Sequence, residues 1–155
     1  MAPPPSATTC VFCAVLRGDQ PASFVLGSPR PAGGGGDDGD SPVAAFLDVR
    51  PLFKGHVLLV PRVHHETLAE LPPELVDPLF RQARRLAAAM EEGLGAAGSF
   101  VAINNRVSQS VPHLHVHVVP RQRKDGLRGF FWPRTGYDSD EERDDWAARV
   151  RAALG

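Results

Sequence analysis

The chain has 155 residues, 43% of them hydrophobic and 23% charged, which suits one globular domain with a sizeable core. Its formal net charge of −1 argues against a broad nucleic-acid or membrane surface. No apolar run approaches the ~20 residues of a membrane helix, and residues 1–9 lack the basic and apolar regions of a signal peptide. We therefore expect a cytoplasmic protein with a disordered N-terminus over residues 1–9 and a single domain over residues 10–155, binding neither nucleic acid nor membrane.

The first third of the chain predicts short elements separated by a flexible loop. Residues 12–16 predict one helical turn that Gly18 ends, and residues 24–26 predict a short strand. Residues 28–41 are mainly glycine and aspartate, a low-complexity composition typical of flexible loops. A phosphate-binding loop is disfavoured, because no Gly-Lys-Ser/Thr sequence follows the glycines and the aspartates would repel phosphate.

Four longer apolar runs predict the main strands of a sheet. The run over residues 55–61 is continuous and bounded by glycine and proline, which is typical of a buried strand. Pro51 marks a turn before it. The four runs cover residues 43–48, 55–61, 100–104 and 111–120.

Two further segments predict helices. Residues 75–94 have helical periodicity, and Asp77 followed by Pro78 predicts the N-cap and first turn. Ser139 and Glu142 have the spacing of a capping box, which predicts a helix running to the C-terminus. Because short turns join most of the strands, we predict an α+β fold with an antiparallel sheet of about five strands, one long helix and a C-terminal helix.

Three histidines alternate with apolar residues in the sequence VPHLHVHVVP. His113, His115 and His117 would share one face of a strand. The opposite face would pack into the core, and it carries Leu114, Val116 and Val118. Half of the six histidines therefore line one short stripe.

Three interpretations of this stripe are open. Solvated strand faces usually carry Thr, Lys, Glu or Ser, which argues against an ordinary exposed face. His-x-His on a strand supplies two zinc ligands, but the outer histidines would lie about 13 Å apart, so all three cannot bind one ion. In the third interpretation, a histidine with an ordinary pKa of about 6.5 attacks phosphorus while its neighbours bind the substrate.

The sequence HLHVHVV at residues 113–119 resembles the His-φ-His-φ-His-φ-φ signature of the histidine triad (HIT) family, in which φ is apolar. The resemblance extends over residues 10–133. It is also carried by CVFC at residues 10–13, AFLDV at 45–49, GHVLLVPRVH at 55–64 and QSVPH at 109–113. It implies a HIT-like fold, a homodimer and a nucleotide substrate, for which we expect a purine nucleoside phosphate.

The resemblance also implies roles for individual residues. His115 would attack the α-phosphorus and form a covalent nucleotidyl intermediate, a reaction that needs no cofactor. His117 would bind the phosphate or the leaving group. Asp48 would accept hydrogen bonds from ribose hydroxyls, although a turn-capping role is the alternative. The other catalytic candidates are His113 and His56; the other substrate-binding candidates are Asn104, Gln109, Ser110, Val11, Phe12 and Leu58, the last three forming the base slot.

Cys10 and Cys13 form a C-x-x-C pair. A structural disulfide is not expected in the cytoplasm, and a redox pair normally follows a strand, which is not predicted here. Metal binding needs two more ligands. The resemblance implies a structural zinc ion that the two cysteines bind together with His64 and His113. His65 lies next to His64, so either of these two histidines could be the third ligand. Two free buried thiols are the alternative.

The segment before the triad departs from the family pattern. Many members carry Asn-Asn-Gly and then Ala-Gly before the glutamine, whereas residues 104–108 are NNRVS and the segment is shorter. Glycine permits positive φ and a close approach of backbone to phosphate, so this departure leaves the shape of the phosphate pocket open. Trp132 and Pro133 resemble the C-terminal segment that some members place near the leaving group.

These observations leave three classes of function. We predict an enzyme that cleaves at the α-phosphate of nucleoside phosphoramidates or dinucleoside polyphosphates. A nucleotide-binding regulatory or scaffold protein with little turnover is the alternative. A metallohydrolase that uses the triad as ligands is disfavoured, because no acidic cluster accompanies the histidines in the sequence.

Overall fold

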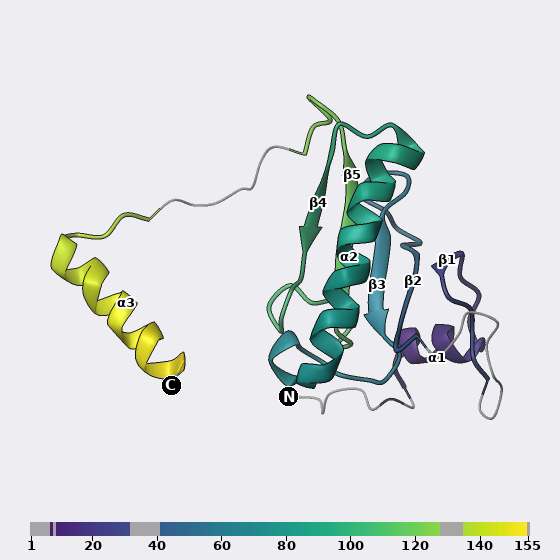
Figure 1. Ribbon diagram of the computed structural model, residues 1–155, viewed down its shortest axis with the longest axis horizontal. Helices are drawn as coiled ribbons and strands as arrows, with labels where there is room; N and C mark the ends of the chain where they lie inside the picture. Colours follow the sequence, from purple (N-terminus) through teal and green to yellow (C-terminus); the bar gives the residue numbers. More distant parts are fainter. Residues whose placement is uncertain (1–6, 8, 32–40, 128–134, 155) are drawn as a thin grey trace. The chain divides into compact units, whose positions relative to one another are not determined.

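The computed structural model describes residues 7, 9–31, 41–127 and 135–154 (Figure 1). The chain divides into two compact units, residues 1–123 and residues 124–155. Most of the predicted disordered N-terminus, most of the predicted loop over residues 28–41, and Trp132 with Pro133 lie outside the described residues. The single domain over residues 10–155 stays a prediction. In the described part of the chain, no helix combines the length and the hydropathy needed to cross a membrane.

A five-stranded antiparallel sheet forms the centre of the first unit, which confirms the predicted α+β fold. Its strands are β1 (Phe24–Leu26), β2 (Val43–Leu47), β3 (Val57–Pro61), β4 (Gly98–Ala102) and β5 (Val116–Arg121), in the order β1-β2-β3-β5-β4. The central strand β3 is buried along its whole length, which explains its continuous apolar sequence. Leu58 of β3 lies opposite His117 of β5, so this register brings the histidine stripe next to the middle of the sheet.

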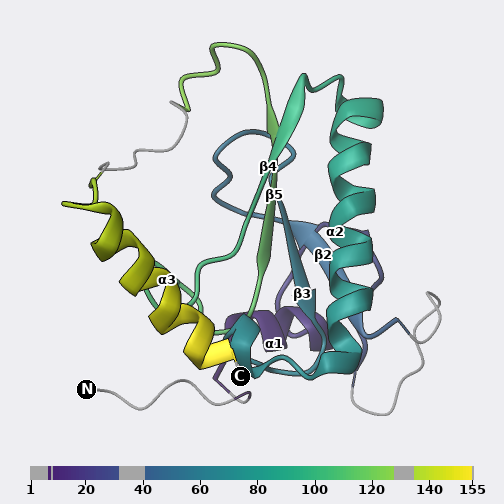
Figure 2. The same cartoon turned by 60° about the vertical axis from the view of Figure 1, so that its left-hand side comes forward.

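Two helices cover opposite faces of the sheet and form two cores (Figures 1 and 2). Helix α2 (Pro73–Leu94) packs against the face that carries Leu59, and Leu79 of this helix is fully buried there. Helix α1 (Val11–Arg17) packs against the other face, where Phe12 contacts the core around Leu58. A short 3-10 helix, η1 (Leu68–Glu70), precedes α2. Because successive strand residues point to opposite faces, β2 and β3 contribute alternately to the two cores.

Helix α2 begins at Pro73, so its predicted start at Asp77 and Pro78 was placed too late. Proline is favoured in the first turn of a helix because its missing N–H would have no partner there. Asp77 pairs with Arg81 one turn along the helix, at 2.9 Å, instead of capping its start.

The second unit contains the predicted C-terminal helix, α3 (Asp140–Leu154). The backbone N–H of Glu142 donates to Oγ of Ser139 at 3.1 Å, as a capping box requires. The Glu142 carboxylate in turn accepts the N–H of Asp138 at 2.6 Å. The predicted start of this helix is therefore confirmed.

Strand β5 begins at Val116, so the predicted strand over residues 111–120 started too early. Pro112 has no N–H to donate, and the N–H of Leu114 donates at 2.6 Å to the carbonyl of His65, in the loop after β3. Only one of the three histidines, His117, therefore lies in a strand. The alternation persists nevertheless, because the residues between and after the histidines all belong to the core under α2: Leu114, Val116 and Val118.

Gly55 has a left-handed backbone, with φ of +96°, just before β3. A Cβ atom there would also lie 2.6 Å from Cδ1 of Leu94, an exposed side chain that can rotate away. We expect Gly55→Ala to lower the free energy of unfolding by about 1–2 kcal/mol, mainly through backbone strain. Gly93→Ala is the matched control: Gly93 lies inside α2 with open space around its Cβ position, so it ought to gain about 0.5–1 kcal/mol. Urea unfolding measures both, and equal effects would contradict the conformation of Gly55.

Candidate active site

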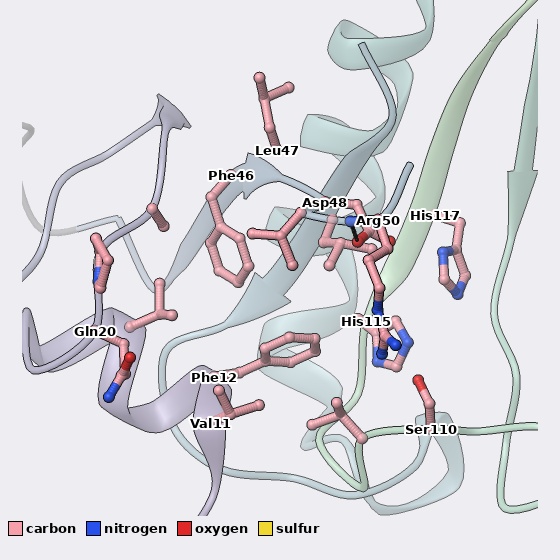
Figure 3. Close-up of a pocket in the computed structure, with 16 residues that line it drawn as sticks. Val11, Phe12, Gln20, Phe46, Leu47, Asp48, Arg50, Ser110, His115 and His117 are labelled. Carbon is pink, nitrogen blue, oxygen red and sulfur yellow. Dashed lines mark hydrogen bonds between the residues drawn. The ribbon is translucent and has the colours of Figure 1, made fainter. Parts of the chain in front are cut away.

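A pocket of about 640 Å³ is formed by α1, β2, β3 and the histidine segment (Figure 3). This volume lies within the range of small-molecule sites. Gln20 and Val11 lie at one end, and Ser110, His115 and His117 lie at the other. The pocket therefore has a mainly apolar end next to α1, where Gln20 is the polar exception, and a polar end at the histidines.

The apolar end is a slot between aromatic rings. Phe12 meets Phe46 edge-on, with ring centroids 5.5 Å apart, and meets His115 in the same way at 5.2 Å. Val11 and Leu58 complete the predicted base slot and line the same pocket. An apolar slot that ends at an imidazole can hold a flat ring at one end and a polar group at the other.

The imidazole of His115 is held by the backbone of His113. Nδ1 of His115 lies 2.7 Å from the His113 carbonyl oxygen, which can only accept, so Nδ1 carries the proton. Burial lowers the pKa of His115 below its ordinary value, although this hydrogen bond opposes the shift. At neutral pH its Nε2 is therefore unprotonated, as a nucleophile requires.

His56 and His117 form a hydrogen-bonded pair beside the nucleophile candidate. The backbone N–H of Leu52 donates to Nδ1 of His56 at 3.2 Å, so the His56 proton lies on Nε2. This Nε2–H donates to Nδ1 of His117 at 3.0 Å, which places the proton of neutral His117 on its own Nε2. Burial lowers the pKa of His117 to about 4, with smaller contributions from His115 and His56. His117 is thus a neutral hydrogen-bond donor at the polar end.

Asp48 follows β2 and lines the pocket. Its Oδ1 accepts the backbone N–H of Arg50 at 2.8 Å, which is the predicted turn-capping alternative. Its Oδ2 lies 3.7 Å from Nδ1 of His56. These two groups are not an ion pair at neutral pH, because burial lowers the pKa of His56 and the N–H of Leu52 already donates to Nδ1. The turn and a contact to ribose are compatible, since they use different carboxylate oxygens.

A second cluster lies behind the pocket and joins both cysteines to two histidines. Nδ1 of His113 lies 3.5 Å from each sulfur, and Nδ1 of His64 lies 3.4 Å from Sγ of Cys13. The four donor atoms all lie within 4.8 Å of one another. Burial, followed by the neighbouring Cys10, raises the pKa of Cys13 to about 11. The cluster includes His64 and does not include His65.

Two residues of the loop before the triad adopt the left-handed backbone conformation that glycine favours, although neither is glycine. Arg106 and Ser108 have φ values of 65° and 60°, a conformation that costs about 1–2 kcal/mol for such residues. Side-chain hydrogen bonds hold the loop in place. Oε1 of Gln109 accepts the N–H of Arg106 at 2.7 Å, and its Nε2 donates to the carbonyl of Glu66 at 2.7 Å. Arg106 also pairs with Glu70 at 2.8 Å.

The pocket brings together many of the predicted residues, though not all. Its lining includes Val11, Phe12, Asp48, Leu58, Ser110, His115 and His117, with His56 bonded to His117. Asn104, Gln109 and His113 do not line it. Gln109 holds the loop instead, and the ring of His113 is turned toward the cysteines.

Two polar residues that line the pocket were missed by the sequence analysis, Gln20 and Arg50. Arg50 lies two residues after Asp48, in the turn that Pro51 marks. Residues in a tight turn lie close together, so a turn that begins at Asp48 places Arg50 at the same rim of the pocket. The sequence already indicated this turn through Pro51. Gln20 follows α1 without any comparable signal.

The HIT domain model matches residues 39–124, and the chain belongs to the HIT family. Protein hit of Bacillus subtilis is 32% identical over 128 residues, covering 81% of this chain and 80% of that protein. The solved structure of a Zn-bound histidine triad family protein from Mycobacterium smegmatis is also similar. It has a TM-score of 0.66 and 33% identity, covering 96% of this chain and 99% of that chain.

Two relatives carry the names of hydrolases. The adenylylsulfatase HINT3 of Arabidopsis thaliana is 29% identical over 120 residues, covering 76% of this chain and 55% of that protein. The asymmetrical bis(5′-nucleosyl)-tetraphosphatase of Schizosaccharomyces pombe is 36% identical over 84 residues, covering 53% of this chain and 46% of that protein. The chain thus matches about half the length of each, and its family includes hydrolases of nucleotide compounds.

The lowered pKa of His117 predicts a loss of stability in acid. Its folded-state pKa of about 4 lies below the ordinary value of 6.5, so the unfolded chain binds the proton more readily. The stabilisation is therefore complete above pH 6.5 and falls as the pH drops toward 4. The pKa of His113 is lowered to about 4 as well, mainly by burial, so His117→Asn ought to make the pH dependence of the free energy of unfolding less steep across this window without abolishing it, as measured by urea titration. An unchanged slope for His117→Asn would contradict the shift.

Proposed function

We propose that this chain is a nucleotide hydrolase or nucleotidyltransferase that acts at an α-phosphate through a nucleotidyl intermediate on His115. The observation that carries the proposal is the hydrogen bond from Nδ1 of His115 to the carbonyl of His113. It leaves Nε2 unprotonated at the boundary between the aromatic slot and the polar end of the pocket. The slot would hold the base, for which a purine is proposed, and Asp48 would accept hydrogen bonds from the ribose.

In the first step, Nε2 of His115 would attack the α-phosphorus and form a P–N bond. The bond from phosphorus to the leaving group breaks, and its electron pair stays on the leaving atom. In the second step, a water oxygen would attack the same phosphorus, the P–N bond would break, and the nucleoside monophosphate would leave. Over both steps one water is consumed, and its two protons end on the products or in solvent.

The neighbouring residues would stabilise charge during both steps. His117 carries its proton on Nε2 and would donate it, or a hydrogen bond, to the leaving atom, while His56 orients His117 through the 3.0 Å contact. The Ser110 hydroxyl would donate to a phosphoryl oxygen. The names of the two hydrolase relatives support cleavage of a phosphate compound of a nucleoside, and both phosphoramidates and dinucleoside polyphosphates fit the steps above.

A structural zinc ion is a second part of the proposal. Tetrahedral zinc with its usual bond lengths separates sulfur and nitrogen ligands by about 3.6 Å, and the cluster has separations of 3.4 and 3.5 Å. Nε2 of His113 points away from the cysteines and lies 2.9 Å from the carbonyl oxygen of Pro61, as the second nitrogen of a zinc-bound histidine commonly does. Cys10, Cys13, His64 and His113 would hold the ion, which would supply a cross-link and leave no coordination position for water. The Zn-bound relative from Mycobacterium smegmatis supports this assignment. We further propose a homodimer and a cytoplasmic location.

We expect His115→Ala to lower the rate of nucleotide hydrolysis by about 10³-fold or more while nucleotide affinity changes little, because the nucleophile is lost and the slot remains. Labelling with nucleotide carrying ³²P at the α-position ought to give one acid-labile label per active site in the unsubstituted protein and none in the variant. His65→Ala is the control for loss of an imidazole outside the pocket. Original turnover by His115→Ala would remove His115 from the mechanism, and tight binding without turnover of any substrate would favour the scaffold alternative.

We expect the purified protein to contain about one zinc ion per chain by elemental analysis. Cys10→Ala and Cys13→Ala ought each to lose the metal and to lower the melting temperature, because both thiolates hold the cross-link. Val15→Ala is the matched control, since it also truncates a buried side chain of α1 but leaves the four ligands in place. Stable protein that lacks zinc after growth with zinc would mean that the cysteines are ordinary core thiols.

A further inference from the structure

Two side chains with a full charge at neutral pH line the pocket, Asp48 and Arg50. The backbone N–H of Arg50 donates to Oδ1 of Asp48 at 2.8 Å, and Pro51 follows immediately. This turn fixes the backbone of Arg50 at the rim. Figure 3 shows Arg50 at the same end of the pocket as His115 and His117, opposite Gln20.

The guanidinium of Arg50 makes no hydrogen bond or ion pair with any residue in the described parts of the chain. Asp48 does not neutralise it, because the contact between the two residues is made by the backbone N–H. Other arginines of the described chain are committed to carboxylates, as Arg17 is to Asp19, Arg81 to Asp77 and Arg106 to Glu70, whereas Arg50 is the arginine that lines the pocket. Arg50 therefore offers an uncommitted planar cation at the site of the proposed chemistry.

The charges of the pocket give this cation a role that the histidines cannot fill. Imidazoles with an ordinary pKa of about 6.5 are mostly neutral at pH 7 and donate hydrogen bonds without carrying charge. A nucleotide brings at least one negative charge to this end, where Asp48 already carries another. Guanidinium is the side chain best suited to bind phosphate oxygens, because its planar fork donates two parallel hydrogen bonds.

The two substrate classes left open differ in the leaving group. A phosphoanhydride releases a phosphate or polyphosphate, and negative charge grows on the leaving oxygen as the P–O bond breaks. A phosphoramidate releases an amine, which carries no negative charge and takes up a proton. A fixed cation beside the leaving group therefore stabilises the first transition state more than the second.

We propose that Arg50 binds the phosphates of the leaving group and that the site therefore selects nucleoside polyphosphates over nucleoside phosphoramidates. This inference rests on the proposed attack by His115 at the α-phosphorus. Arg50 transfers no proton: the electron pair of the broken P–O bond remains on the leaving oxygen, and the guanidinium donates hydrogen bonds to that group. Arg50 thereby determines specificity from a position outside the histidine triad.

The test compares two substrates that share adenosine and the α-phosphate, diadenosine tetraphosphate and adenosine 5′-phosphoramidate. Arg50→Gln ought to lower kcat/KM for diadenosine tetraphosphate by about 10- to 100-fold, as expected for loss of hydrogen bonds to a charged group. It ought to change kcat/KM for the phosphoramidate by less than about 3-fold. Arg50→Lys ought to recover part of the loss, because it keeps the charge without the planar fork. Arg84→Gln, on the exposed surface of α2 and outside the pocket, is the matched control and ought to change neither value.

The ratio of the two effects separates specificity from a structural role. A substitution that disturbs the fold lowers both values alike, so equal losses, or no loss, would overturn the role of Arg50. If the unsubstituted protein hydrolyses neither substrate, the proposed function fails, and equilibrium binding then tests Arg50 separately. Arg50→Gln ought to weaken ATP binding by about 10-fold or more and AMP binding by less than about 3-fold; equal effects on ATP and AMP would overturn the inference.

Discussion

The hydrogen bond from Nδ1 of His115 to the carbonyl of His113 connects the pocket to the cysteine cluster. Its acceptor is well positioned, because the ring of His113 is fully buried between the two sulfurs and the carbonyl of Pro61. The backbone of His113 is thereby tied to β3, and the His115 ring is tied to that backbone. His115, the proposed nucleophile, must present Nε2 to the substrate. It therefore depends on His113, which does not line the pocket.

Alternation of side chains along residues 113–118 allows one segment to serve the cluster, the pocket and the core at once. Leu114, Val116 and Val118 are fully buried under α2, which fixes the rotation of the segment about its own axis. The histidines must then face the other way, toward α1. A shift of one residue would bury imidazoles in the α2 core and expose the apolar side chains, so the hydrophobic pattern excludes it. The core under α2 therefore stabilises the sheet and also fixes the face on which the histidines lie.

Sequence patterns predicted the elements in which one hydrophobic pattern continues over the whole length. The continuous run of β3 and the periodicity of α2 are examples, and the resemblance identified His115, His117 and Asp48 at the pocket. The start of β5 was placed too early because Leu114 bonds to the carbonyl of His65, a contact between distant segments that alternation cannot show. The role proposed for Arg50 depends on an unpaired guanidinium at the rim of the pocket, which likewise can be seen only in the three-dimensional arrangement.

Gln109 was predicted to bind the substrate, but its side chain bonds to the loop before the triad. Family members with glycine can adopt left-handed backbone there at little cost, whereas Arg106 and Ser108 adopt it with side chains attached. The loop therefore needs other contacts, and Gln109 supplies two of them through both ends of its amide. These two hydrogen bonds hold the Gln109 amide against the loop, and Gln109 does not line the pocket. Ser110, the next residue along the chain, does line the pocket, so the proposed contact from this loop to the substrate would be made by Ser110.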